Sequence, residues 1–208
     1  MQRKVRVTLA AATLAILAVG LWATEGRAVP VQWSSGGGGN DHFYDFIPGS
    51  FAWAGALADA PTKSHLGQPG YLATVTSGGE DTFIRTSVTT STAWLSGSDA
   101  ATEADWKWMA GPEAGQSFWI SGVTQPGFVA LWGPGEPNNA LGIEHVLHMN
   151  FHAAPNSWND MFAGSTYGYI IEFNQNQGSV PQPAALLLFG AGLAGVGVRA
   201  WRRHRGKP

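Results

Sequence analysis

The sequence predicts an α+β domain flanked by two apolar terminal segments. Two amphipathic helix patterns come early in the chain and several short strand patterns follow them, an order typical of α+β domains rather than of alternating α/β folds. The composition of the 208 residues agrees, because 10 Trp, 10 Phe and 28 Gly stand beside only 12% charged residues. This balance favours a loop-rich domain packed around large aromatic rings.

Both predicted helices lie in the first part of the domain. Strands are expected over residues 42–46, where apolar and polar side chains alternate, and over residues 70–75. Ser50 stands where it can cap the first helix, whose apolar side chains recur on one face. Ser77 and Glu80 have the spacing of a capping box, which predicts that the second helix begins there.

The remainder of the domain is expected to consist of strands and long loops. Strand patterns cover residues 93–97, 106–109, 144–149 and 167–173. The chain has no Cys, so packing, hydrogen bonds or bound metal must hold the loops in place. The formal net charge is −2 and the strongest basic cluster lies at the C-terminus, which argues against a nucleic-acid partner.

The N-terminus has the pattern of a secretory signal peptide. A basic start is followed by an apolar run and then by small residues near Ala28. We therefore expect residues 1–28 to be a signal peptide, with a permanent membrane anchor as the alternative. Residues 29–41 contain Ser-Ser-Gly-Gly-Gly-Gly, which predicts a flexible lead-in to the domain.

The C-terminus has the pattern of a short transmembrane segment. Residues 184–198 are apolar and residues 199–208 are strongly basic. A helix of about 15 residues rises roughly 22 Å, which is marginal for a hydrocarbon core of about 30 Å. The positive-inside rule places the basic tail in the cytoplasm, so the bulk of the chain is expected outside the inner membrane.

A linker over residues 175–183 joins the domain to this segment and contains Val180-Pro181-Gln182-Pro183. A proline motif, a short span and a basic end together resemble the PEP-CTERM sorting signal of Gram-negative bacteria, in which Glu usually stands where this chain has Gln182. The resemblance implies an exosortase-type processing enzyme as partner, transient contact with the inner membrane, and a destination on the cell surface or in the extracellular matrix. The alternative is an ordinary C-terminal anchor.

The middle of the chain, residues 42–174, resembles the C-type lectin-like family. The stretches that carry the resemblance occur in the family's order: FAWAGALADA, GYLATVTSGGEDTFI, AWLSGSD, DWKWMAGPEAG, WGPGEPNN, IEHVLHM, SWNDM and GYIIEF. The resemblance implies two helices, short antiparallel sheets and a long calcium-binding loop. Val146, Ala163 and Ile171 stand where the family has cysteines, so packing must replace bridges that contribute about 2–5 kcal/mol in small domains.

Five oxygen-bearing side chains are predicted to bind calcium. Ca²⁺ takes about six to eight oxygen ligands, and carboxylates and amides supply them. Glu136 and Asn138 are two residues apart, so an extended backbone directs both to one side. The resemblance also implies a cis bond before Pro137. The predicted ligands are Glu136, Asn138, Glu144, Asn159 and Asp160.

The same five side chains are predicted to hold a sugar. Neighbouring sugar hydroxyls can share lone pairs with the ion, donate to carboxylates such as Glu136 and Glu144, and accept from amides such as Asn138. Trp132, beside the loop, is a candidate for stacking on the ligand. By resemblance, the Glu-Pro-Asn order implies a mannose-type polysaccharide. The sequence thus predicts an exported, calcium-dependent carbohydrate-binding protein that is not an enzyme.

Four alternatives bear on this prediction. The fold can serve a calcium-stabilised surface protein that makes protein contacts without binding sugar. A zinc site at His145, His148 and His152 is disfavoured, because the first two point to opposite faces of a strand. Glycoside hydrolysis by Glu136 and Glu144 is disfavoured, because calcium would occupy both carboxylates. An accessory calcium ion is not expected, since His145 stands where many members of the family have Asp.

Overall fold

The computed structural model describes residues 29–151 and 157–175. The predicted signal peptide 1–28, the apolar segment 184–198, the basic tail 199–208 and His152 lie outside the described residues. Within the described ranges, no helix combines the length and the apolar character that a membrane span requires.

The described residues form two α-helices and eleven short strands. The helices are α1 (Trp53–Asp59) and α2 (Gly78–Phe83), and α2 continues into a π-helical turn, η3 (Ile84–Val88). Three 3₁₀ turns complete the helical elements: η1 (Ser35–Gly37), η2 (Ala60–Thr62) and η4 (Ala140–Gly142). The strands are β1 (Val31–Gln32), β2 (Phe43–Phe51), β3 (Ser64–His65), β4 (Gln68–Leu72), β5 (Ala93–Ser98), β6 (Asp105–Trp108), β7 (Ser117–Ile120), β8 (Val123–Thr124), β9 (Glu144–Met149), β10 (Asn159–Phe162) and β11 (Tyr167–Phe173).

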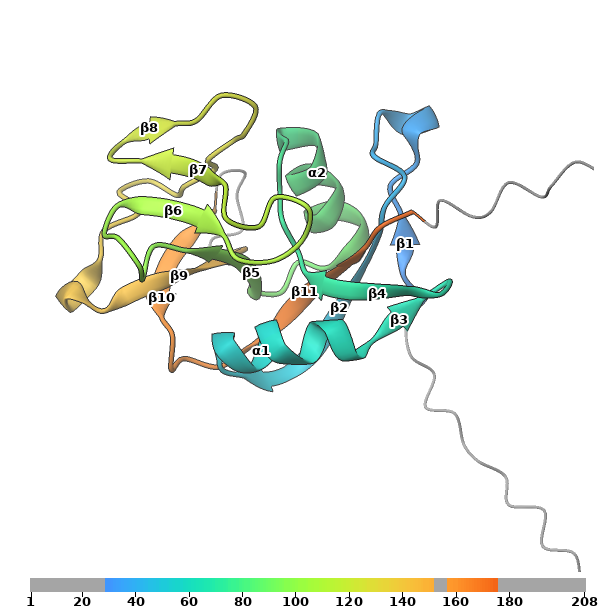
Figure 1. The fold of residues 1–208 in the computed structure, drawn as a ribbon, viewed down its shortest axis with the longest axis horizontal. Helices are drawn as coiled ribbons and strands as arrows, with labels where there is room; N and C mark the ends of the chain where they lie inside the picture. Colours follow the sequence, from blue (N-terminus) through green and yellow to red (C-terminus); the bar gives the residue numbers. More distant parts are fainter. Residues whose placement is uncertain (1–28, 152–156, 176–208) are drawn as a thin grey trace, which may run out of the picture.

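One mixed sheet runs through the fold, with β2 and β11 near its centre (Figure 1). β11 pairs antiparallel with β2 and β4 and parallel with β5. From β5 the sheet continues through β6 to β8 on one branch and through β9 to β10 on the other. The parallel β11–β5 pairing differs from the antiparallel sheets that the sequence predicted. It arises because β11, the last strand, lies between β2 and β5 in the sheet.

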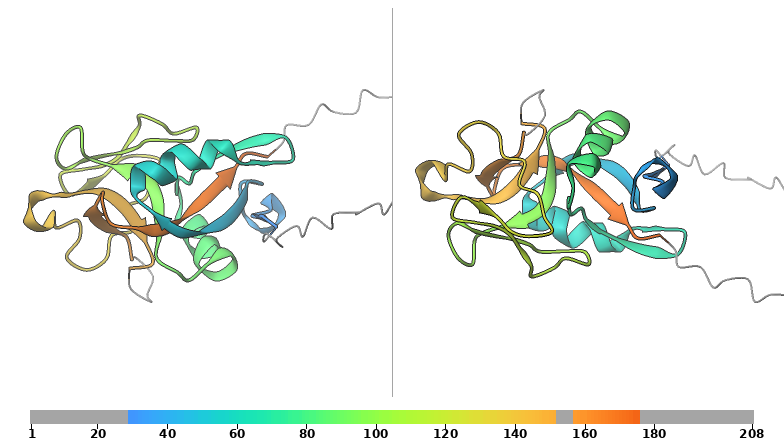
Figure 2. Two further views of the ribbon diagram at one scale, coloured as in Figure 1. Left: turned by 90° about the horizontal axis from the view of Figure 1, so that it is seen from below. Right: turned by 90° about the horizontal axis from the view of Figure 1, so that it is seen from above.

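The two helices lie on opposite sides of the central β2–β11 pair (Figure 2). The Oγ of Ser77 accepts a hydrogen bond from the Glu80 N–H at 3.1 Å, so the predicted cap of α2 is confirmed. The predicted cap of α1 is wrong: Ser50 lies inside β2, and α1 follows Ala52 without a side-chain cap. The chain stays extended there because β2 pairs with β11 as far as Phe51.

Residues 29–41 fold back onto the domain, which differs from the flexible lead-in that their glycine run predicted. β1 pairs with β2. The ring of Trp33 stacks on Phe83 with 5.9 Å between centroids. The carboxylate of Asp41 accepts from the Ser35 N–H at 2.7 Å. An aromatic contact and a local hydrogen bond therefore offset the entropy that the glycines lose on ordering.

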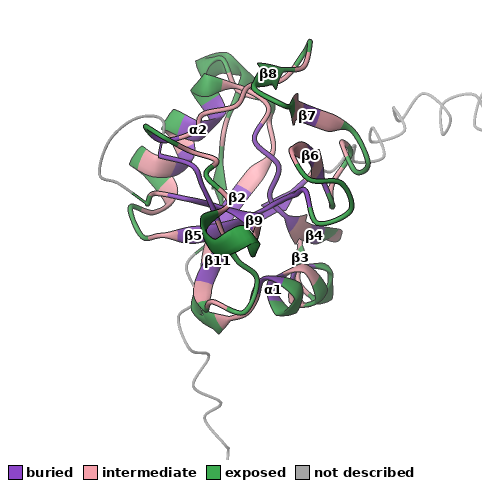
Figure 3. Ribbon diagram, turned by 90° about the vertical axis from the view of Figure 1, so that its left-hand side faces the viewer, coloured by how far each residue is buried: buried purple, intermediate pink, exposed green. Residues whose placement is uncertain are grey.

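Two clusters of buried apolar side chains make up the core, and Figure 3 shows buried residues along the middle of the sheet. Trp106, Trp108 and Trp158 belong to one cluster, together with Leu147. The other cluster contains Val146 and Ile171, which are 2% and 0% exposed. Two of the three positions where the family has cysteines are thus packed into the core, as predicted.

Candidate functional site

The long loop that precedes β9 is held along one edge of β10. The Trp158 N–H donates to the Leu131 carbonyl at 3.0 Å, and the Gly133 N–H donates to the Trp158 carbonyl at 2.8 Å, which makes a parallel bridge between Trp132 and Trp158. Successive residues of a strand direct their backbone groups to alternate edges. The backbone of Asp160 therefore faces the same edge, beside the loop.

Asp160 fastens the next part of the loop through its side chain. Its Oδ1 accepts from the Asn138 N–H at 3.1 Å and its Oδ2 accepts from the Asn139 N–H at 2.6 Å. The residue is 0% exposed. Hydrogen bonds to a carboxylate are shorter and stronger than those between neutral groups, so this pair sets the position of the loop relative to β10.

Glu144 makes a second, reciprocal connection to the loop. Its Oε2 accepts from the Ala140 N–H at 3.0 Å, and its own N–H donates to the Asn139 Oδ1 at 3.1 Å. Asn139 has a φ of 44°, a left-handed conformation that Asn tolerates better than most side chains do. Sequence reasoning did not give Asn139 a role; the structure shows that it holds the loop in shape.

Glu136 completes a group that we call the carboxylate cluster: Glu136, Glu144 and Asp160. The Oε2 of Glu136 is buried and has no hydrogen-bond partner among the described residues. Burial, contact with the Asp160 carboxyl and the charge of Glu144 raise the pKa of Glu136 to about 7. Burial and the charge of Asp160 raise the pKa of Glu144, although the Ala140 N–H opposes this. The Glu136–Pro137 bond is cis, which confirms the prediction.

The two predicted amide ligands lie beside this cluster. Asn138 is exposed on the loop, between Glu136 and the turn at Asn139. Asn159 is 4% exposed, and its Nδ2 contacts the Asp160 carbonyl oxygen and lies 2.9 Å from the His148 Nε2. Because the Asp160 carbonyl faces the loop, the Asn159 amide reaches the same edge of β10.

Trp132 is half-buried and packs against the aromatic core. Its ring centroid lies 4.8 Å from that of Trp106, 5.9 Å from Trp119 and 6.2 Å from Trp158. Its Nε1 is buried without a hydrogen-bond partner among the described residues. The contacts give Trp132 a part in holding the loop against the core, and its contact with a ligand stays a prediction.

A further group of potential metal ligands comprises Asp99, Glu103 and His145, whose ligand atoms lie within 4.8 Å of one another. The His145 Nδ1 lies 3.1 Å from the Asp99 Oδ1 and 3.6 Å from the Glu103 Oε2. Sequence reasoning missed this group, since it forms only where the end of β5 meets the start of β9. His148 does not belong to this group; it is fully buried beside Asn159.

Comparison with solved structures identifies the fold. The C-type lectin CEL-I from Cucumaria echinata superposes with a TM-score of 0.51 at 20% sequence identity, over 64% of this chain and 91% of that chain. The chain folds as a C-type lectin-like domain. The predicted α+β fold is therefore confirmed, in a form without cysteine.

Two curated relatives each match somewhat less than two thirds of this chain. Halomucin from Haloquadratum walsbyi is 41% identical over 132 residues, which is 64% of this chain and 1% of halomucin. The mouse C-type lectin domain family 4 member F is 28% identical over 131 residues, which is 63% of this chain and 21% of that protein. The chain thus spans much less than two thirds of either relative.

Residues 179–203 match the PEP-CTERM protein-sorting motif. The predicted sorting signal is therefore confirmed, although its residues lie outside the described ranges. Such a signal implies an exported, cell-surface protein that is processed by an exosortase.

Proposed function

We propose that this protein is an exported, calcium-dependent carbohydrate-binding protein whose site is the carboxylate cluster together with Asn138 and Asn159. The observation that carries the proposal is the Oε2 of Glu136, which is buried and has no hydrogen-bond partner in the part of the chain that the structure describes. The Glu136 carboxyl also contacts the Asp160 carboxyl and lies near that of Glu144. A buried carboxylate oxygen without a partner is costly. A divalent cation at this place would satisfy it and neutralise the repulsion.

The chemistry of the ligand set favours calcium over a softer metal. The five side chains offer only carboxylate and amide oxygens, and the Asp160 carbonyl faces the same edge. Hard cations such as Ca²⁺ prefer such oxygens, and the set approaches the about six ligands that the ion needs. Three carboxylates and one divalent cation leave one negative charge, which suits a ligand that donates hydrogen bonds.

A sugar diol has the hydrogen-bonding character that remains. Its hydroxyls can lend lone pairs to the ion and donate to Glu136 or Glu144, while the Asn138 amide donates in return. The match to the mouse C-type lectin domain family 4 member F and the C-type lectin-like fold support a carbohydrate ligand, and the Glu-Pro-Asn order supports a mannose-type polysaccharide. The sorting motif supports a place on the surface or in the matrix of a Gram-negative bacterium.

The test is binding of the full-length chain to immobilised mannan, with galactan as the comparison. We expect mannan binding in CaCl2, loss of binding in EDTA and recovery when calcium is restored. Asn138→Asp should abolish mannan binding because it removes the amide donor. Asn174→Asp is the matched control: its Oδ1 accepts from the Tyr71 hydroxyl at 2.8 Å, which a carboxylate can also do.

A sugar-blind protein would give a different result. If EDTA lowers the melting temperature but neither polysaccharide binds, the calcium site stabilises a surface used for protein contacts. If Asn138→Asp binds mannan as the wild type does, the proposed arrangement of the diol is wrong.

A further inference from the structure

His148 lies directly beside a predicted calcium ligand without belonging to the ligand set. β9 and β10 are antiparallel, and His148 is the Cα partner of Asn159. Side chains of residues paired in this way project from the same face of the sheet, with about 4.5–5.5 Å between their Cβ atoms. The imidazole is therefore the cross-strand neighbour of the Asn159 amide.

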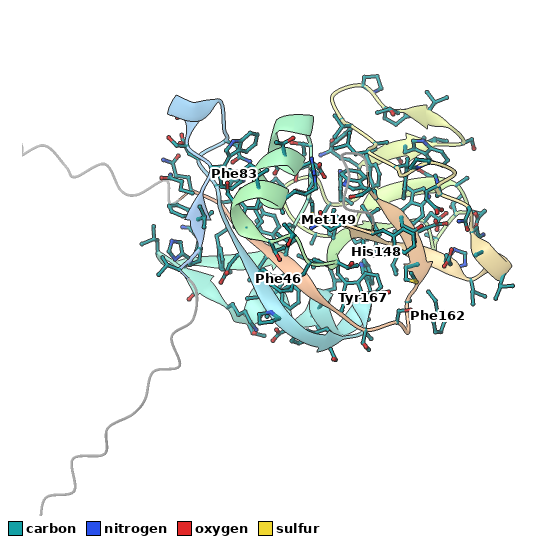
Figure 4. All side chains as sticks on the ribbon, turned by 180° about the vertical axis from the view of Figure 1, so that it is seen from behind. Phe46, Phe83, His148, Met149, Phe162 and Tyr167 are labelled. Carbon is teal, nitrogen blue, oxygen red and sulfur yellow. The ribbon has the colours of Figure 1, made fainter. Side chains whose placement is uncertain are left out.

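The ring of His148 is held on three sides by other rings. It stacks on Tyr167 with 5.3 Å between centroids and an interplanar angle of 9°, and Figure 4 shows the two side chains beside one another. The rings of Trp94 and Phe151 meet it edge-on at 5.8 Å and 5.4 Å. The residue is 0% exposed, so its ring cannot turn without displacing its neighbours.

The hydrogen bonds at Asn159 define which atom of the amide faces which partner. The Asp160 carbonyl can only accept, so the atom that contacts it must be the amide nitrogen. The same Nδ2 lies 2.9 Å from the His148 Nε2, which must then accept with its lone pair. Both amide hydrogens are thereby engaged, and the planar amide leaves only Oδ1 available to a cation.

The state of the other ring nitrogen supports a functional use of this histidine. With Nε2 as acceptor, the single proton of the neutral ring is on Nδ1. Nδ1 is buried and has no hydrogen-bond partner among the described residues. An apolar side chain of similar size would fill this position without leaving a buried donor unpaired.

We propose that His148 is a positioning residue, whose Nε2 orients the Asn159 amide so that Oδ1 is presented to the calcium ion. This inference rests on the proposed function, because it requires Asn159 as a ligand. Loss of a partner that orients a metal ligand typically lowers metal affinity by about 10- to 100-fold. We expect a loss of that size when the lone pair at position 148 is removed.

The test compares substitutions in the full-length chain that keep or remove the acceptor. His148→Phe and His148→Leu fill the space without a lone pair, whereas His148→Gln places an amide oxygen at a similar reach. Calcium affinity is measured by competition with a fluorescent chelator, and the melting temperature in EDTA reports on folding. We expect affinity about 10- to 100-fold lower in the Phe and Leu variants and within about 3-fold of wild type in the Gln variant.

Several outcomes would overturn the inference. Equal calcium affinity in the wild type and the Phe variant would show that the lone pair is not needed. Equal losses in all three variants, with lower melting temperatures in EDTA, would show that the ring only fills space. If Phe and Leu do not fold, ¹⁵N NMR of the wild-type imidazole decides: an Nδ1–H tautomer supports the inference and an Nε2–H tautomer overturns it. A wild-type chain that binds no calcium would instead refute the proposed function.

Discussion

The substitution Asp160→Asn tests how the long loop is held. The wild-type carboxylate accepts from two backbone N–H groups, at 3.1 Å and 2.6 Å, and is fully buried. An Asn side chain has one oxygen, so its NH₂ would meet the second N–H and leave that donor unpaired. Such a loss costs about 1–3 kcal/mol. In a domain of this size it lowers the melting temperature by roughly 2–12 °C.

The assay is thermal unfolding of the full-length chain in EDTA at about pH 5.5 and pH 8. The pKa of Glu136 is raised to about 7, so its carboxyl is protonated at pH 5.5. Removal of the Asp160 charge then relieves little repulsion, because Glu136 is neutral. The destabilisation should therefore be larger at pH 5.5 than at pH 8, where removing the Asp160 charge relieves repulsion.

The matched control for this substitution is Asp105→Asn on β6. Its carboxylate accepts from the Ser117 hydroxyl and pairs with Lys107 on a partly exposed face, so its loss should cost about 0–1 kcal/mol. If Asp160→Asn melts at the wild-type temperature, or no lower than the control, the carboxylate does not hold the loop.

Three further predictions concern pH and packing. Burial beside Glu172 raises the pKa of Glu80 from its ordinary 4.5 to about 7. The folded state therefore binds the Glu80 proton more tightly than the unfolded state does, and the stability of the metal-free chain falls as the pH rises from about 4.5 to about 7. Glu80→Gln should reduce this dependence of the free energy of unfolding on pH, as measured by urea titrations at several pH values. The same pH dependence in the variant and the wild type would refute the prediction. Acidification from pH 8 to pH 5 should weaken calcium binding, because Glu136 takes up a proton. Titration calorimetry measures the calcium affinity at both pH values, and equal affinities would contradict this prediction. Gly70→Ala would place a Cβ 2.7 Å from the Ile171 Cγ1, and we expect it to lower the free energy of unfolding by about 1–3 kcal/mol. An unchanged free energy of unfolding would show that the Ile171 side chain moves aside freely.

Much of the fold could be predicted from local patterns. The bounds of β9 and β11 agree with the predicted strands, because each combines alternation with buried branched or aromatic side chains. β8 has only two residues, and its pairing with β7 depends on tertiary contacts that leave no periodic signal. The same reason accounts for β1, whose pairing with β2 overrides the glycine run beside it.

The sequence could propose residue types for the candidate site, but it could not give the orientation of their side chains. The order of Glu136, Asn138 and Asp160 in two short motifs was enough to suggest oxygen ligands. The bonds from two loop N–H groups to the Asp160 carboxylate depend on how the loop lies on β10, which sequence does not state. The contact between Asp99 and His145 joins residues 46 apart and needs the β5–β9 pairing.

Calorimetric titration of CaCl2 into the chelator-stripped full-length chain tests the central claim most directly, with Glu136→Gln as the paired variant. We expect one saturable calcium site in the wild type, because the buried Oε2 of Glu136 has no hydrogen-bond partner within residues 29–151 and 157–175. The neutral amide of the variant should weaken this site strongly. Absence of binding heat in the wild type, or equal affinity in both proteins, would contradict the claim that the carboxylate cluster binds calcium.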